Sequence, residues 1–188
     1  LPGETAAAAP PADGAAAARS LAAFVAALHH PAPADAPSNP FRGVALQARA
    51  AAVDERVQRL ADVIDAPRVR AAWQRLHDTP AWDGPPLWLH GDLHPSNMLT
   101  LDGRLSAVID FGDICAGDPA TDLALAWMMF RPTGRAVFRH AAGIDDHTWQ
   151  RAAGWALSLS LAYLTADDTT SMPAIGRTTL AAVLTEFA

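Results

Sequence analysis

Three short apolar runs in the middle of the chain constrain its fold more than any other feature. They cover Leu87–Leu89, Met98–Leu101 and Leu105–Ile109, and Asp102-Gly103 separates the last two. An Asp-Gly pair between two such runs is a strong signal for a β-hairpin. Runs of this length suit strands better than helices. We therefore expect a small β insert that contains a hairpin.

The chain on both sides of this insert has helical patterns. Apolar residues recur every three or four positions, and capping residues or prolines mark where helices begin. The segment from His30 to Pro40 contains four prolines and is expected to be a loop. Together these signals predict an α+β fold that is mainly α-helical. The expected helices span about 13–29, 46–61, 67–78 and 118–130, one begins at Pro132, Asp145 or Asp146 caps another that ends near 164, and Ser171 with Pro173 caps the last, which ends near 187.

Composition excludes several classes of function. All 14 basic residues are arginine, so this chain cannot supply a lysine amine for a Schiff base or for gripping a nucleotide phosphate. The formal net charge is -6, whereas broad nucleic-acid binding needs a basic face. The single cysteine, Cys115, allows no internal disulfide. We expect neither a nucleic-acid partner nor a disulfide-stabilised scaffold.

The sequence shows no targeting or membrane segment. Leu1–Thr5 has neither a basic region nor a sustained apolar stretch. The longest uncharged stretch, Ala152–Ala166, is shorter than the roughly 20 residues that span a bilayer. We expect a cytoplasmic protein with no membrane contact. Because the chain has no initiator methionine, we also expect it to be a fragment of a longer protein.

Aspartates concentrate between His90 and Asp122, at the ends of expected strands and in loops, where side chains are held rigidly and exposed. The hairpin brings Asn97, which begins its first arm, next to Asp110, which ends its second. An amide oxygen beside a carboxylate suits Mg²⁺, which takes few protein ligands. Asp92 lies in a tight loop nearby and is free to accept a proton from a hydroxyl. A base beside Mg²⁺ is the minimal set for phosphoryl transfer to an alcohol.

Two motifs at the right separation resemble a known family. His90-x-Asp92-Leu93-x-x-x-Asn97 matches the kinase catalytic loop, and Asp110-Phe111-Gly112 matches the kinase metal-binding tripeptide. The resemblance covers about residues 87–127. The variant is similar to the aminoglycoside phosphotransferase (choline-kinase-like) family, as judged from Gly91, His94-Pro95, Asp113, Gly117-Asp118-Pro119 and Asp122-Leu123-Ala124.

The resemblance implies a reaction and a role for each central residue. Asp92 is expected to be the catalytic base, and Asn97 and Asp110 are expected to hold Mg²⁺. ATP is the expected phosphoryl donor, with GTP not excluded. The acceptor is expected to be a hydroxyl group of a small molecule.

The resemblance also implies supporting roles. His90 is expected to support the catalytic loop by hydrogen bonding, and Asp122 to brace the backbone of that loop. His94 stands where many protein kinases have a lysine and is a candidate contact for phosphate or substrate. Asp113 is expected to face either the metal or a cationic substrate.

The chain departs from the family in lacking the amino-terminal lobe. It has no Gly-rich phosphate-covering loop, no nucleotide-binding lysine and no paired helix glutamate. The expected organisation is an inter-lobe linker remnant at 1–12 and a kinase-like carboxy-terminal lobe at 13–188. We predict that the missing lobe lies upstream of Leu1, and that this chain alone binds ATP weakly and has little or no turnover.

The motifs do not identify the acceptor. An excess of acidic residues would suit a cationic aminoglycoside, and thus antibiotic resistance, although acidic surface also serves solubility. These residues are Asp113, Asp145, Asp146, Asp167 and Asp168. Homoserine, choline, sugar and macrolide hydroxyls stay open as acceptors.

Two other classes of function stay open. One is a non-catalytic binding lobe or a remnant of an enzyme. The other is a metal-dependent phosphohydrolase, because His90-Gly-Asp92-x-His94 resembles part of a site that uses histidines and aspartates around two metals.

Nearby polar residues have structural interpretations. Cys115 has no basic partner and is expected to be an inert thiol. Asp118 is expected to cap a helix. His29 and His30 end a helix, where positive charge suits the helix dipole.

Overall fold

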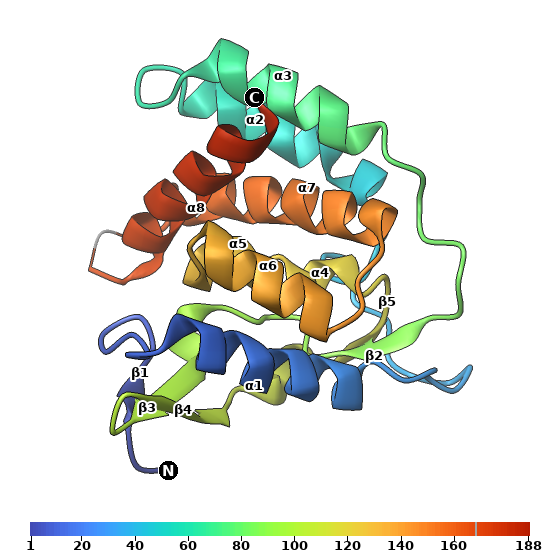
Figure 1. Cartoon of the computed structure of the whole chain (residues 1–188). Helices are drawn as coiled ribbons and strands as arrows, with labels where there is room; N and C mark the ends of the chain where they lie inside the picture. The colour runs from blue at the N-terminus through green and yellow to red at the C-terminus, as the bar shows by residue number, and fades with distance from the viewer. Residues whose placement is uncertain (168) are drawn as a thin grey trace.

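The structure, a computed structural model, describes residues 1–167 and 169–188 and is mainly helical, with two small antiparallel sheets (Figure 1). Three single-turn 3-10 segments are η1 (Leu46–Arg49), η2 (Pro95–Asn97) and η3 (Phe111–Asp113). The strands are β1 (Glu4–Thr5), β2 (Leu87–Leu89), β3 (Met98–Leu101), β4 (Arg104–Val108) and β5 (Cys115–Gly117). The helices are α1 (Gly14–Leu28), α2 (Ala50–Arg59), α3 (Ala66–His77), α4 (Ala120–Leu123), α5 (Leu125–Met129), α6 (Pro132–Ala141), α7 (Asp146–Tyr163) and α8 (Met172–Phe187).

The predicted hairpin is confirmed as β3 and β4. Met98 pairs with Val108 at one end, and Leu101 pairs with Arg104 at the other. Asp102 and Gly103 both have positive φ, at 49° and 72°. Positive φ at both central residues is what a two-residue hairpin turn requires, because it matches the twist of the two strands.

Two further strands were not predicted. β5 pairs antiparallel with β2, and β1 pairs antiparallel with β3. Both are too short to show a local pattern, and their partners lie far away in the sequence. β1 and the buried Ala6 lie in the segment that the sequence suggested as a linker remnant. The boundary at residue 12 stays a prediction.

Most helix starts match their expected caps. The Asp13 carboxylate accepts the N–H groups of Ala15 and Ala16 at 2.9 and 3.0 Å. The Asp145 carboxylate accepts the N–H of Thr148 at 2.9 Å, which places the cap of α7 at Asp145. These bonds satisfy N–H groups that have no partner in the first helical turn.

Three expected helix features are wrong in detail. The helix expected at 46–61 begins as the 3-10 turn η1, and the one expected at 118–130 divides at Ala124 into α4 and α5. At that division the Trp127 N–H donates to the Ala124 carbonyl at 3.2 Å, a tight i→i−3 bond. The Ser171 side chain makes no cap, because its hydroxyl is hydrogen-bonded to the Ser96 hydroxyl at 2.8 Å.

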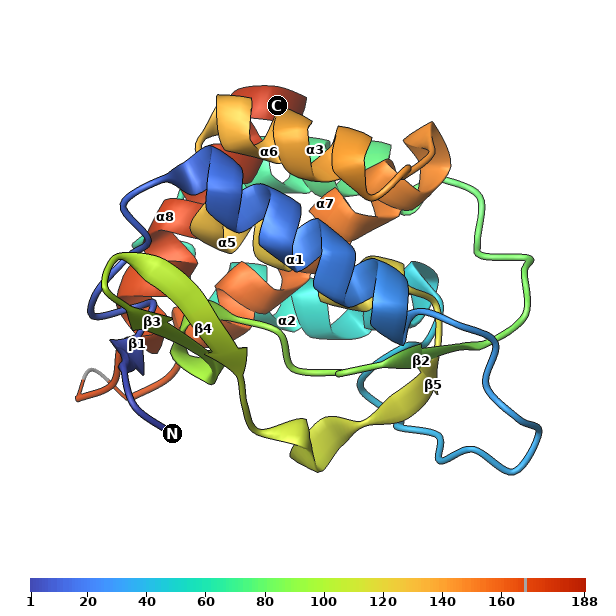
Figure 2. The same cartoon turned by 60° about the horizontal axis from the view of Figure 1, so that its bottom comes forward.

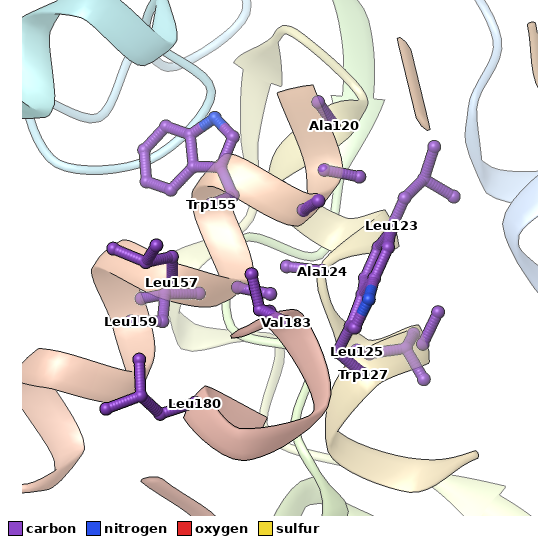
Figure 3. Packing of buried hydrophobic residues seen from close by; sticks show 14 of the residues in the cluster. Ala120, Leu123, Ala124, Leu125, Trp127, Trp155, Leu157, Leu159, Leu180 and Val183 are labelled. Carbon is purple, nitrogen blue, oxygen red and sulfur yellow. The ribbon is translucent and has the colours of Figure 1, made fainter. Parts of the chain in front are cut away.

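The core is organised around α7. In Figure 1 this helix crosses the middle of the molecule, with α2 and α3 on one side and α4 to α6 on the other. Nearly all of its residues are buried, and small residues let neighbours approach closely. A Cβ on Gly154 would lie 2.4 Å from Leu46 Cδ2. Figure 3 shows Trp155 and Leu157 of α7 with Val183 of α8 and Leu125 of α5 in this core.

A buried ion pair connects Arg151 of α7 with Asp118, which lies just before α4. Arg151 Nε lies 2.8 Å from Asp118 Oδ2, and each side chain is 3% exposed. Arg151 also donates to the Pro80 carbonyl and to the Thr148 hydroxyl. Asp118 Oδ1 accepts the N–H of Ala120 at 3.0 Å, in keeping with its expected capping role.

No helix in the described part of the chain has the length and apolar character needed to cross a membrane.

Replacement of Arg151 by leucine should strongly destabilise the fold, because it leaves the Asp118 carboxylate buried without its cation. We expect a loss of about 3–5 kcal/mol in the free energy of unfolding, measured by urea titration. The matched control is Arg70→Leu, which breaks the exposed pair with Asp54. That change should cost about 1 kcal/mol or less. Equal losses in the two variants would contradict the role assigned to the buried pair.

Candidate active site

The catalytic-loop motif lies between β2 and β3 and crosses the backbone that follows β4. At the crossing, Gly91 has a φ of +85°, and a Cβ there would lie 2.3 Å from the Asp113 carbonyl oxygen. A non-glycine residue would meet both an unfavourable φ and a backbone clash. Gly91 therefore lets the loop and the Asp110–Asp113 segment pass in contact.

The imidazole of His90 joins the same two segments. It is fully buried, with Nε2 3.0 Å from the Ile109 carbonyl oxygen and Nδ1 3.3 Å from the Asp92 nitrogen. A carbonyl only accepts, so the hydrogen is assigned to Nε2, and Nδ1 accepts the Asp92 N–H. The His90 ring therefore bonds to the backbone of both Asp92 and Ile109, the residue before Asp110.

The fully buried carboxylate of Asp122 holds the start of the loop. Its Oδ2 accepts the N–H of His90 at 2.8 Å, and its Oδ1 accepts the N–H of Gly91 at 2.9 Å. His29 Nε2 also lies 3.0 Å from Oδ2. Charge-assisted bonds of this kind compensate for the burial of a carboxylate.

The expectation that His29 serves only the dipole of its helix is therefore incomplete. The end of α1 reaches Asp122 across 93 positions of sequence. No local pattern around His29 could have shown this contact, because it joins residues 93 positions apart in the sequence.

The Asp92 carboxylate lies among three polar side chains. Arg42 Nη2 is 3.2 Å from Oδ1, and His94 Nε2 is 3.3 Å from Oδ2. The Asn97 amide nitrogen donates to the Asp92 carbonyl at 3.0 Å and to Oδ2 at 3.3 Å. Burial by itself would raise the pKa of Asp92, but His94 and Arg42 together hold that pKa below its usual value. The carboxylate is therefore ionised at neutral pH.

His94 contacts Asp92 rather than open solvent. Its Nδ1 accepts the N–H of Ser96 at 3.2 Å, so the hydrogen is assigned to Nε2, which faces Asp92. The side chain is only 6% exposed. Its role as a phosphate or substrate contact stays a prediction.

The backbones of Asn97 and Asp110 lie side by side at the open end of the hairpin. The Ile109 N–H donates to the Asn97 carbonyl at 2.9 Å. Asp110 has a left-handed φ of 64° and is exposed. Because the Asn97 nitrogen donates to Asp92, the amide oxygen is left for another partner.

This donor set fits Mg²⁺, since an amide oxygen and an exposed carboxylate are hard ligands, and Mg²⁺ needs few from the protein. Among the described residues there is no cluster of three or more His, Cys, Asp or Glu side chains that could hold a metal. A two-metal phosphohydrolase site would need such a cluster.

The loop between α1 and η1 supplies residues that the sequence did not single out. Asn39 donates to Asp113 Oδ1 at 3.1 Å, and Arg42 donates to Asp92. Figure 2 shows this segment, in light blue, beside β2 and β5. Neither residue lies in a recognisable motif, so only the packing of the loop identifies them.

Several acidic residues suggested a cationic acceptor. Each of those that the structure describes already has a hydrogen-bond or ion-pair partner within the chain. Asp145 caps α7, and Asp146 pairs with Arg139. Asp167 accepts the N–H of Thr169, and Asp113 accepts from Asn39. Asp168 lies outside the described residues.

Cys115 should be unreactive in the folded protein. Its side chain is buried, and burial, with the nearby charges of Asp122 and Asp113, raises its pKa to about 11. We expect slow reaction with a disulfide reagent at about pH 8, and fast reaction after unfolding, because the thiolate is the reactive form. Rapid labelling of the native protein would contradict this prediction.

A family model matches most of this chain. The model of the phosphotransferase enzyme family (APH) matches residues 1–155. No curated protein matches the chain.

Solved structures with the same fold include macrolide and aminoglycoside phosphotransferases. A macrolide 2'-phosphotransferase of Brachybacterium faecium is 22% identical, with a TM-score of 0.57, and the match covers 97% of this chain and 67% of that one. An aminoglycoside phosphotransferase solved with GDP and kanamycin is 20% identical, with a TM-score of 0.62, over 96% of this chain and 66% of that one.

The chain thus spans about two thirds of the length of these solved proteins. Its fold is that of a kinase-like carboxy-terminal lobe in which a small β-hairpin carries the catalytic-loop motif. On the match of the family model over most of its length, the chain belongs to the phosphotransferase enzyme family.

Proposed function

We propose that this chain is the carboxy-terminal lobe of an enzyme that transfers the γ-phosphoryl group of ATP to a hydroxyl of a small molecule. The observation that carries the proposal is the ionised Asp92 carboxylate, which accepts from the Asn97 amide, while the Ile109 N–H bond to the Asn97 carbonyl places Asp110 next to Asn97. Solved relatives support a nucleotide donor and a small acceptor, since one contains GDP and kanamycin and another contains AMP-PNP and hygromycin B.

Asp92 is the base of the proposed reaction. As the acceptor oxygen forms its bond to phosphorus and ADP leaves, the acceptor hydroxyl gives its proton to an Asp92 oxygen. Arg42, His94 and Asn97 hold the carboxylate in one orientation. Because the pKa of Asp92 is low, its contribution is to orient the hydroxyl and to accept the proton late, as charge leaves that oxygen.

The Asn97 amide oxygen and the Asp110 carboxylate would hold Mg²⁺. When bound there, the ion would neutralise charge on the phosphates of the donor. His90 sets the spacing between base and metal residues, because its ring contacts the backbone on both sides.

The proposal also includes a second lobe that covers the site. Phe111 directly follows Asp110, Ile114 lies four positions after it, and the two residues are 42% and 39% exposed. Apolar side chains beside a reactive site are typical of a surface that another part of the protein covers. A lobe over these residues would close the nucleotide site. Without it we expect weak ATP binding and little turnover.

Replacement of Asp92 by asparagine tests the base. In the protein that carries the upstream lobe, Asp92→Asn should lower kcat by about 10²-fold or more, because the amide cannot accept the proton. ADP release in the presence of an acceptor measures the rate, and circular dichroism checks the fold. The matched control is Asp102→Asn, since Asp102 lies in the exposed hairpin turn and asparagine tolerates its positive φ. Wild-type turnover by Asp92→Asn would exclude Asp92 as the base.

Sequencing the coding DNA upstream of Leu1 tests the second lobe. We expect an in-frame segment of roughly a hundred residues that encodes a Gly-rich hairpin and a strand lysine or its equivalent. A start codon immediately before Leu1 would contradict the two-lobe proposal and would favour the non-catalytic binding lobe.

A further inference from the structure

Three arginines lie close enough to affect one another's charges, and one of them contacts Asp92. Arg42 comes from the loop before η1, Arg49 ends η1, and Arg56 is in α2. Arg49 and Arg56 are seven positions apart, so they lie two turns apart on one face. Arg42 connects this group to the base through its 3.2 Å contact with Asp92.

The guanidinium groups of these residues have almost no protein partners. Each offers five N–H donors. Within the described residues the three side chains make one hydrogen bond, from Arg42 Nη2 to Asp92. Arg42 Nε, Arg49 Nε and Arg56 Nη1 are buried without any partner. Arg49 as a whole is only 9% exposed. Unpartnered buried donors are costly, and in native proteins nearly all such groups are satisfied by protein, water or a bound ion.

The charges of the cluster are also uncompensated. Burial, followed by the charges of Arg56 and Arg42, lowers the pKa of Arg49. Burial also lowers the pKa of Arg56, with Arg42 adding to the effect and Glu55 opposing it. In the part of the chain that the structure describes, no carboxylate pairs with Arg49 or Arg56. The three cations repel one another, and with one carboxylate paired to Arg42 and the charge of Glu55 near Arg56 the cluster keeps a positive excess.

The facing side of α7 adds further donors. The Arg49 guanidinium carbon lies 5.6 Å from the centroid of the Trp155 ring. Trp155 Nε1 and Ser158 Oγ are both buried without a partner. These two residues are three positions apart in α7 and therefore lie on one face.

We propose that Arg42, Arg49 and Arg56 form an anion-binding subsite beside Asp92, and that the acceptor carries a carboxylate or a phosphate in addition to the hydroxyl that receives the phosphoryl group. Guanidinium groups match both anions with paired N–H donors. The subsite disfavours a cationic aminoglycoside. The link to an acceptor rests on the proposed function, whereas anion binding does not.

Calorimetric titration of this chain with three compounds that share one carbon skeleton tests the subsite. D-glycerate carries a carboxylate, glycerol 3-phosphate carries a phosphate, and glycerol is neutral. We expect the two anions to bind, more weakly as salt increases, and glycerol not to bind. Choline and kanamycin serve as cationic comparisons and are not expected to bind.

Variants identify the residues that hold the anion. Arg49→Gln and Arg56→Gln should each raise the Kd for the anions by about tenfold or more, because each removes charge-assisted bonds. Arg59→Gln is the matched control, since Arg59 is an exposed arginine of the same helix, and its Kd should not change. Thermal unfolding checks each fold. If Arg49→Gln does not fold, the half-buried Arg56, which has no aromatic partner, carries the test.

The outcomes separate this inference from the proposed function. Failure of both anions to bind, equal binding by all variants, or binding of choline or kanamycin in their place would overturn the subsite. Binding to the arginines, with no phosphoryl transfer to any hydroxyl compound by the protein with its upstream lobe, would support the subsite and overturn the proposed function. Phosphoryl transfer to choline but not to glycerate would support the proposed function and overturn the subsite.

Discussion

The buried carboxylate of Asp122 accepts two successive backbone N–H groups from the catalytic loop and faces the His29 imidazole. Because an unpartnered buried charge is costly, these contacts hold α1, α4 and the loop in one arrangement. The direction in which the loop leaves β2 follows from them. That direction brings Gly91 against Asp113 and leaves no space there for a Cβ. The positions of Asp92, Asn97 and Asp110 depend on this junction.

From this junction the site has two different sides. On one side the Asp110 segment is exposed, which agrees with the proposal that a nucleotide and a second lobe bind there. On the other side Arg42 joins Asp92 to arginines on η1 and α2. α7 packs against those elements and forms the centre of the core. The proposed anion subsite therefore lies next to the helix that organises the core.

Features with local causes could be predicted from the sequence. The Asp102-Gly103 turn, the Asp13 cap and the core position of Trp155 each depend on neighbours within a few residues or on hydrophobicity. The pairing of the hairpin arms then made Asn97 and Asp110 neighbours. β1 and β5 could not be predicted, because neither Glu4–Thr5 nor Cys115–Gly117 forms an apolar run like that of Leu87–Leu89, and both strands pair with distant partners. The division of α4 from α5 likewise depends on how that segment packs.

The sequence alone determined the two motifs, the hairpin between them and therefore the family and the reaction class, because these depend on residue type and spacing along the chain. Only the tertiary structure decided which residues surround Asp92 and its loop. His29, Asn39 and Arg42 lie between 50 and 93 positions from their partners. Such contacts leave no local periodicity, since they arise when helices pack and loops cross. The absence of a paired carboxylate at Arg49 and Arg56 among the described residues likewise follows from packing and not from the local sequence.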